Sequence, residues 1–178
     1  MQFHFLIGQA IGLVLPQVQR LIRRYLSDKA IVYGHQAYAD YMRVIANCDM
    51  FLNPFPFGNT NGIVDTVFAG LVGVCKTGPE VHEHIDEGMF GRLDFPRWLV
   101  ADTVDKYVEA ALILIDDAGE RKTLAQNLAG PAAINKVIFA GRAEILGDKI
   151  EALWKSRLSQ HAAPAAAKTG SLGTVMEV

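Results

Sequence analysis

Apolar and polar positions follow two alternating patterns from the N-terminus to about Asp117. Short continuous apolar runs, typical of buried strands, alternate with longer segments in which apolar residues recur every three or four positions, as in helices that cover a core on one side. Strands are expected at residues 3–7, 30–33, 50–52, 72–75 and 98–101. Helices are expected at about 16–25, 38–47, from the turn at 59–61 to 70, 80–89, 103–116, 120–128 and within 142–158.

This alternation predicts an α/β fold, a Rossmann-like parallel sheet with helices on both faces, because parallel strands need long crossover connections. From Gln160 onward the sequence loses its helical periodicity and is rich in alanine, glycine and proline. We therefore expect one domain over residues 1–159 and a loosely ordered tail over residues 160–178.

Composition argues against two classes of partner. The chain has 178 residues, a formal net charge of −2 and no basic block, which argues against nucleic acid. The apolar start, FHFLIGQAIGLVLP, follows no Lys or Arg, is interrupted by glycine and proline, and is too short to span a bilayer, so we expect no membrane partner. Cys48 and Cys75 lie in apolar runs, which favours buried free thiols and a cytoplasmic location.

The stretch NPFPFGNTNGIVDTVFAG, residues 53–70, is the strongest candidate for a binding site. A strand end passes through an amide-rich turn into a helix, and the turn residues Asn59, Thr60 and Asn61 all prefer helix N-caps. Unpaired N–H groups at such a helix end attract anions, so phosphate is the obvious ligand. Asp65 falls about one turn further on, where its carboxylate can accept a sugar hydroxyl. An ordinary capped helix with a solvated aspartate explains the pattern equally well.

Several turns are expected at the same edge of the sheet. Ligands of parallel α/β sheets bind beyond the carboxyl ends of the strands, which is where residues 8–9, 34–38, 53–61 and 76–79 fall. There, His35 can donate to a phosphate or hydroxyl, or can simply cap a turn. Tyr38 can stack on a base, or can simply begin its helix.

The segment VHEHIDEG is a poor candidate for a metal site. His82 and His84 are two positions apart on an expected helix, so they point to different sides, and the HExxH spacing is absent. We expect no metal. The plainer alternative is an acidic helix N-terminus with His82 or His84 near a ligand.

Four segments together resemble a known family: HFLIGQA, YGHQAYADYM, CDMFLNPFPFGNTNGIVDTVFAGLVGVCKTG and EVHEHIDEG. They are similar to the cytoplasmic bacterial N-glucosyltransferases that modify high-molecular-weight adhesins. These enzymes belong to glycosyltransferase family 41 and are relatives of the eukaryotic O-GlcNAc transferases. The resemblance covers about residues 3–128. It implies the C-terminal, donor-binding half of a GT-B enzyme that transfers glucose from UDP-glucose, with inversion and without a metal or other cofactor, to asparagine in Asn-x-Ser/Thr sequons.

The resemblance also implies roles for individual residues. Those implied to bind the UDP-sugar are Asn59, Thr60 and Asn61 at the helix start, with Thr60 and Asn61 on the diphosphate, Asp65 on the ribose, and His35, Gln36 and Tyr38 around the uracil. Gln9 is implied to be catalytic, near the transferred sugar and the acceptor. These positions are the ones that the pattern of strands and turns places at the ligand edge.

One departure from the family is as important as the matches. The family has an acceptor-binding N-terminal half and a lysine that neutralises the diphosphate, and neither is found in this sequence. Losing that cation costs several orders of magnitude in rate, because stabilising the departing UDP is the main task of a metal-free site. We therefore expect a fragment that is not active alone and needs the missing half, with a sequon-bearing polypeptide as acceptor. The alternatives are an isolated module that binds nucleotide without turnover, and an unrelated sugar-phosphate isomerase or epimerase.

Overall fold

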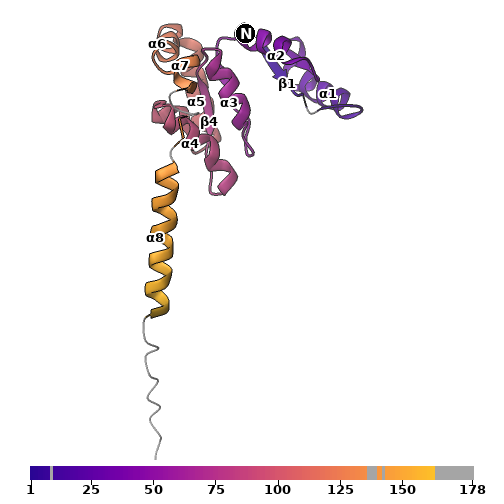
Figure 1. Ribbon diagram of the computed structural model, residues 1–178. Helices are drawn as coiled ribbons and strands as arrows, with labels where there is room; N and C mark the ends of the chain where they lie inside the picture. Colours follow the sequence, from indigo (N-terminus) through magenta and orange to yellow (C-terminus); the bar gives the residue numbers. More distant parts are fainter. Residues whose placement is uncertain (9, 136–139, 142, 163–178) are drawn as a thin grey trace, which may run out of the picture. The chain divides into compact units, whose positions relative to one another are not determined.

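The computed structural model describes residues 1–8, 10–135, 140–141 and 143–162. The chain groups into two compact units, Met1–Ala140 and Gly141–Val178, which are described separately. Figure 1 follows the elements of both units along the chain by colour.

The first unit begins with a pair of parallel strands and their helices. The elements are β1 (Phe3–Leu6), α1 (Val14–Leu26), a 3₁₀ turn η1 (Ser27–Lys29), β2 (Ala30–Tyr33) and α2 (Tyr38–Ala46). Strands β1 and β2 pair in register from Phe3 opposite Ala30 to Leu6 opposite Tyr33. The turn after β2 leads directly into α2, as the sequence predicts.

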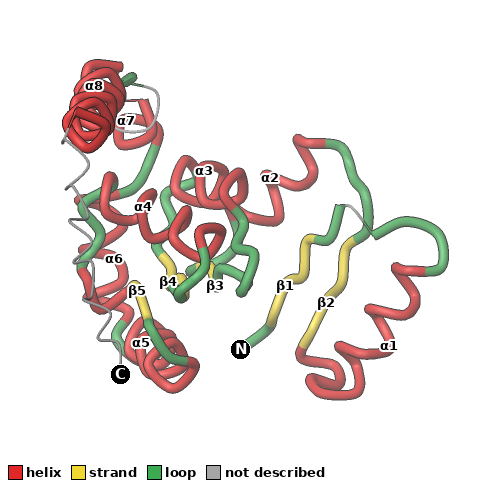
Figure 2. Tube along the Cα trace, turned by 90° about the horizontal axis from the view of Figure 1, so that it is seen from below, coloured by secondary structure: helices red, strands yellow, loops and turns green. Residues whose placement is uncertain are grey.

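The rest of the first unit is built on a second parallel sheet of order β3-β4-β5. Its elements are β3 (Phe51–Leu52), α3 (Thr60–Phe68), β4 (Gly73–Lys76), η2 (Val81–Glu83), α4 (His84–Arg92), η3 (Arg97–Leu99), β5 (Val100–Ala101), α5 (Val104–Asp116), α6 (Ala118–Leu128) and α7 (Pro131–Ala133). Figure 2 shows α3 and α4 on one side of this sheet and α5 on the other. The predicted α/β class, with parallel strands and helices on both faces, is confirmed for this sheet.

The strands form two separate sheets and not the single sheet that the sequence predicts. Strand β3 pairs with β4. Phe51 N–H donates to Val72 O (3.1 Å), and Asn53 N–H donates to Val74 O (2.9 Å). Strand β1 pairs with β2 alone. Within the described residues, no ladder therefore joins one sheet to the other.

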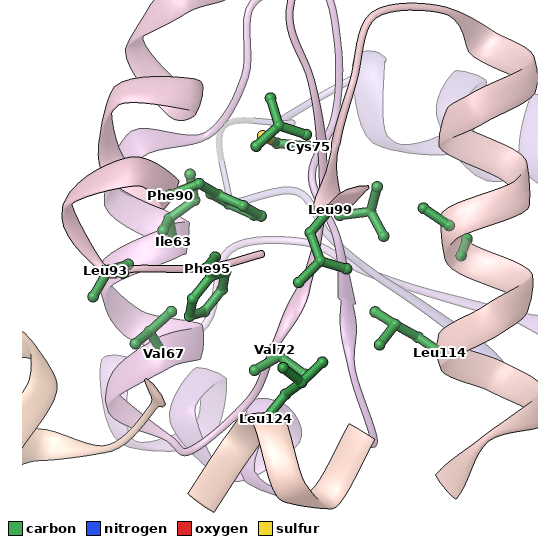
Figure 3. Close-up of a cluster of buried hydrophobic side chains, with 14 of the residues drawn as sticks. Ile63, Val67, Val72, Cys75, Phe90, Leu93, Phe95, Leu99, Leu114 and Leu124 are labelled. Atoms are coloured by element: carbon green, nitrogen blue, oxygen red, sulfur yellow. The ribbon is translucent and has the colours of Figure 1, made fainter. Parts of the chain in front are cut away.

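The hydrophobic core fills both faces of β4 (Figure 3). Ile63 and Val67 of α3 and Phe90 of α4 pack on one face, and Leu114 of α5 packs on the other; all four are fully buried. The core therefore fixes α3 and α4 against the sheet, and these are the helices that carry the candidate site.

The second unit contains α8 (Ala143–Ala162). The helix predicted within residues 142–158 begins at Ala143. It extends to Ala162, so its last turn includes the first residues of the predicted tail. The remainder of that tail, residues 163–178, lies outside the described residues. Among the described helices, none has the length and apolar character that crossing a membrane requires.

Candidate functional site

The N-terminus of α3 is an exposed helix end with a side-chain cap. Asn59 caps it by accepting a hydrogen bond from Gly62 N–H at its Oδ1 (3.3 Å). The capping role predicted for this turn is confirmed and falls to its first residue. Asn59, Thr60 and Asn61 are all exposed, so the first turn of the helix is open to an anionic ligand.

Asp65 lies one turn into α3 and joins it to α2. The Tyr38 hydroxyl donates a hydrogen bond of 2.8 Å to Asp65 Oδ1, and this bond raises the pKa of the tyrosine. Burial, together with the charge of Asp65 and a hydrogen bond to it, raises the pKa of Tyr41 to about 12. The structure thus brings Tyr38 and Asp65 together, and the carboxylate is held beside the open end of α3.

The other predicted site residues differ in what surrounds them. His35 is exposed in the turn between β2 and α2. Gln36 is half-buried, and its Nε2 is shielded from solvent with no acceptor among the described residues. Gln9 lies outside the described residues. The ligand roles of all these residues stay predictions.

Asp86 of α4 is a component of the site that the sequence analysis missed. Its side chain is buried behind the turn, and Oδ2 accepts hydrogen bonds from Asn53 Nδ2 (2.5 Å) and Asn59 N–H (3.2 Å). The sequence does contain one indication that Asp86 is buried. Asp86 lies four positions before Phe90, so both residues lie on the helix face that packs inward.

Glu87 connects α4 to the end of β4 and to η3. It accepts hydrogen bonds from Thr77 Oγ1 (2.5 Å) and Arg97 Nη1 (2.6 Å), and it pairs with His84 Nδ1 (2.9 Å). The hydrogen bonds from Thr77 and His84, followed by that from Arg97, lower the pKa of Glu87 to about 2. His82 stacks on Phe57 at 5.0 Å between ring centroids. Among the described residues, no group of three or more metal-ligating side chains comes together.

The Glu87→Gln variant is expected to unfold more easily at neutral pH, by about 1–2 kcal/mol, because a partly exposed carboxylate with several donors loses its charge. Its pKa is lowered from 4.5, so this contribution is present above pH 4.5 and is lost as the pH falls toward 2. Urea unfolding of both proteins from pH 7 to pH 3 measures the difference, which should narrow on acidification. Glu109→Gln, an exposed site on α5, is the control, and a pH-independent difference would contradict the role of the charge.

The fold is that of a parallel α/β domain of the kind found in O-GlcNAc transferase-like GT-B enzymes. Among solved structures, a point mutant of the Thermobaculum terrenum O-GlcNAc transferase is similar to this chain, with a TM-score of 0.71 and 16% sequence identity. The superposed region covers 90% of this chain and 32% of the transferase chain. At that identity the likeness shows the fold alone. No protein-family model matches the chain.

Two curated relatives are more similar in sequence. They are the UDP-glucose:protein N-beta-glucosyltransferases of Actinobacillus pleuropneumoniae serotype 5b (strain L20) and serotype 7 (strain AP76), each 52% identical over 145 residues, or 82% of this chain. The resemblance carried by the sequence motifs is therefore confirmed: over most of its length this chain is similar in sequence to two protein N-glucosyltransferases. The chain spans 23% of the length of these relatives.

Proposed function

We propose that this chain is the donor-binding part of an inverting glycosyltransferase that moves glucose from UDP-glucose to asparagine in Asn-x-Ser/Thr sequons of a polypeptide. The observation that carries the proposal is the open N-terminus of α3 with Asp65 held one turn behind it by Tyr38 at 2.8 Å. Helix N–H groups suit a diphosphate, and a carboxylate at this distance along the helix suits the adjoining ribose. The similarity to protein N-glucosyltransferases supports the same donor and class of acceptor.

Three groups of residues bind three parts of the UDP-sugar donor. Asn59, Thr60 and Asn61 bind the diphosphate, Asp65 binds the ribose, and His35, Gln36 and Tyr38 surround the uracil, with Gln9 near the sugar and the acceptor. Gln36 is half-buried, and its amide is of the kind that can donate to a uracil carbonyl.

The neutral donors around α3 favour direct binding of the diphosphate, without a metal or other cofactor. They supply hydrogen bonds but little net positive charge, so the cation that stabilises departing UDP comes from elsewhere. We place that cation and the acceptor site in an N-terminal half, since the relatives extend well beyond the matched segment. The free thiols of Cys48 and Cys75 support a cytoplasmic location.

Calorimetric titration of the chain with UDP-glucose, UDP and GDP tests donor binding, and an assay of glucose transfer to a sequon peptide tests turnover. Uridine-selective binding without transfer is the expected result for the donor-binding part, since the relatives are about four times longer than the matched segment. Transfer by the chain alone would show that no second half is needed. Absence of nucleotide binding would overturn the proposal and favour the isomerase or epimerase.

A further inference from the structure

A carboxylate is buried beneath the turn that precedes α3. Asp86 is 3% exposed, on the first turn of α4, and it faces the segment from Asn53 to Thr60. Gly58 in that turn has φ +69°, and a Cβ placed on it would overlap Oδ2 of Asp86. The backbone therefore packs directly on the carboxylate, and the close approach requires glycine.

Hydrogen bonds from the turn converge on a single oxygen of this carboxylate. Asn53 Nδ2 and Asn59 N–H both donate to Oδ2, at 2.5 and 3.2 Å. The other oxygen, Oδ1, is buried and accepts no hydrogen bond from the described residues. One end of the bonded segment is at the exit of β3 and the other is at the cap of α3, so the carboxylate fixes both ends of the turn.

Keeping the Asp86 carboxylate buried and charged costs free energy. Burial raises the pKa of Asp86, against the opposing hydrogen bonds from Asn53 and Asn59. A raised pKa means that the ionised form destabilises the folded chain at neutral pH relative to the protonated form. A buried charge retained at such a cost is a candidate for a positioning role.

We propose that Asp86 is a positioning residue that holds the Asn53–Thr60 turn so that the first turn of α3 faces the diphosphate of the donor. It holds the Asn59 N–H inward, which leaves the exposed residues Thr60 and Asn61 at the open end of the helix. The inference rests on the proposed function, because it assigns a support to the same site.

The test compares Asp86→Asn with Asp148→Asn, which makes the same chemical change at an exposed position of α8. The Kd for UDP is measured by calorimetry and the Kd for uridine, which has no phosphate, by NMR titration. Asp86→Asn should weaken UDP binding about tenfold and change uridine binding by less than about twofold. Its stability in urea should be unchanged or higher, because a desolvated charge is removed, and Asp148→Asn should behave as the unsubstituted chain.

A second variant provides the rescue. Asn53→Asp combined with Asp86→Asn exchanges the two partners and keeps one amide-carboxylate hydrogen bond, so it should recover a part of the lost UDP affinity. Unchanged UDP binding in Asp86→Asn, or an equal loss for UDP and uridine, would overturn the positioning role.

Failure of the proposed function is distinguishable from failure of this inference. If the unsubstituted chain binds no UDP, the proposed function fails, and amide hydrogen exchange then decides the role of Asp86. Faster exchange at Asn59 and Gly62 in Asp86→Asn, with Val74 in β4 unchanged, supports Asp86 as the residue that holds the turn. Unchanged exchange at Asn59 and Gly62 overturns it.

Discussion

Asp65→Ala should weaken UDP binding by about 1.5–3 kcal/mol, the contribution of hydrogen bonds to a charged group, which is roughly 10- to 150-fold in Kd. The carboxylate is half-buried, and the Tyr38 hydroxyl already orients it, so the free site needs little reorganisation to receive a ribose. Removing it deletes an acceptor on which both the ribose and the tyrosine depend. Calorimetric titration with UDP measures the loss.

Two matched variants separate the ribose contact from its support. Tyr38→Phe removes only the hydroxyl that orients Asp65, and it should weaken UDP binding less than Asp65→Ala does, because the acceptor remains. Asp65→Asn keeps the size of the side chain and removes its charge, so it should fall between the two. A UDP Kd that is the same in Asp65→Ala as in the unsubstituted chain would refute the ribose contact.

The spacing of apolar and polar residues predicts individual helices and strands well, because it reflects which side of each element is buried. Strand β2 and the start of α2 at Tyr38 agree with the prediction. The helix predicted from residue 103 begins at Val104, with Thr103 as its cap accepting Lys106 N–H at 3.2 Å. Strand β5 is shorter than predicted, since Trp98 belongs to a 3₁₀ turn. Apolar runs therefore predict where strands lie better than where strands begin and end.

Contacts between distant segments were not predictable in the same way. An amphipathic pattern says that α1 has an apolar face but not what covers it, and in the structure Leu21 and Tyr25 on that face are more than half exposed. The hydrogen bond from Tyr38 to Asp65 joins residues 27 positions apart, and that from Asn53 to Asp86 joins residues 33 apart. The rule for parallel sheets places Tyr38 and Asp65 at one edge of a single sheet, whereas in the structure the strands that precede them belong to separate sheets. No such rule brings a helix carboxylate beneath the turn.

Phe90→Ala should have the largest effect on stability, a loss of about 3–5 kcal/mol in the free energy of unfolding. Phe90 is fully buried and meets Phe51 and Phe95 edge to face, at 6.0 and 4.9 Å between ring centroids. Truncating it leaves a cavity where α4 packs against the sheet. Urea unfolding measures the loss.

Phe68→Ala is the matched control, since Phe68 ends α3 and is 45% exposed, and it should cost less than about 1 kcal/mol. Equal losses in the two variants would contradict a core centred on α4. Because Phe90 belongs to the same core cluster as Ile63 and Val67, its loss should also loosen α3, which carries Asp65 as well as the turn that faces the diphosphate. In the absence of denaturant, Phe90→Ala should therefore lower the affinity for UDP and the affinity for uridine together. Asp86→Asn should lower the affinity for UDP alone. The contrast separates a helix that has lost its packing from a helix that has lost the carboxylate under the turn.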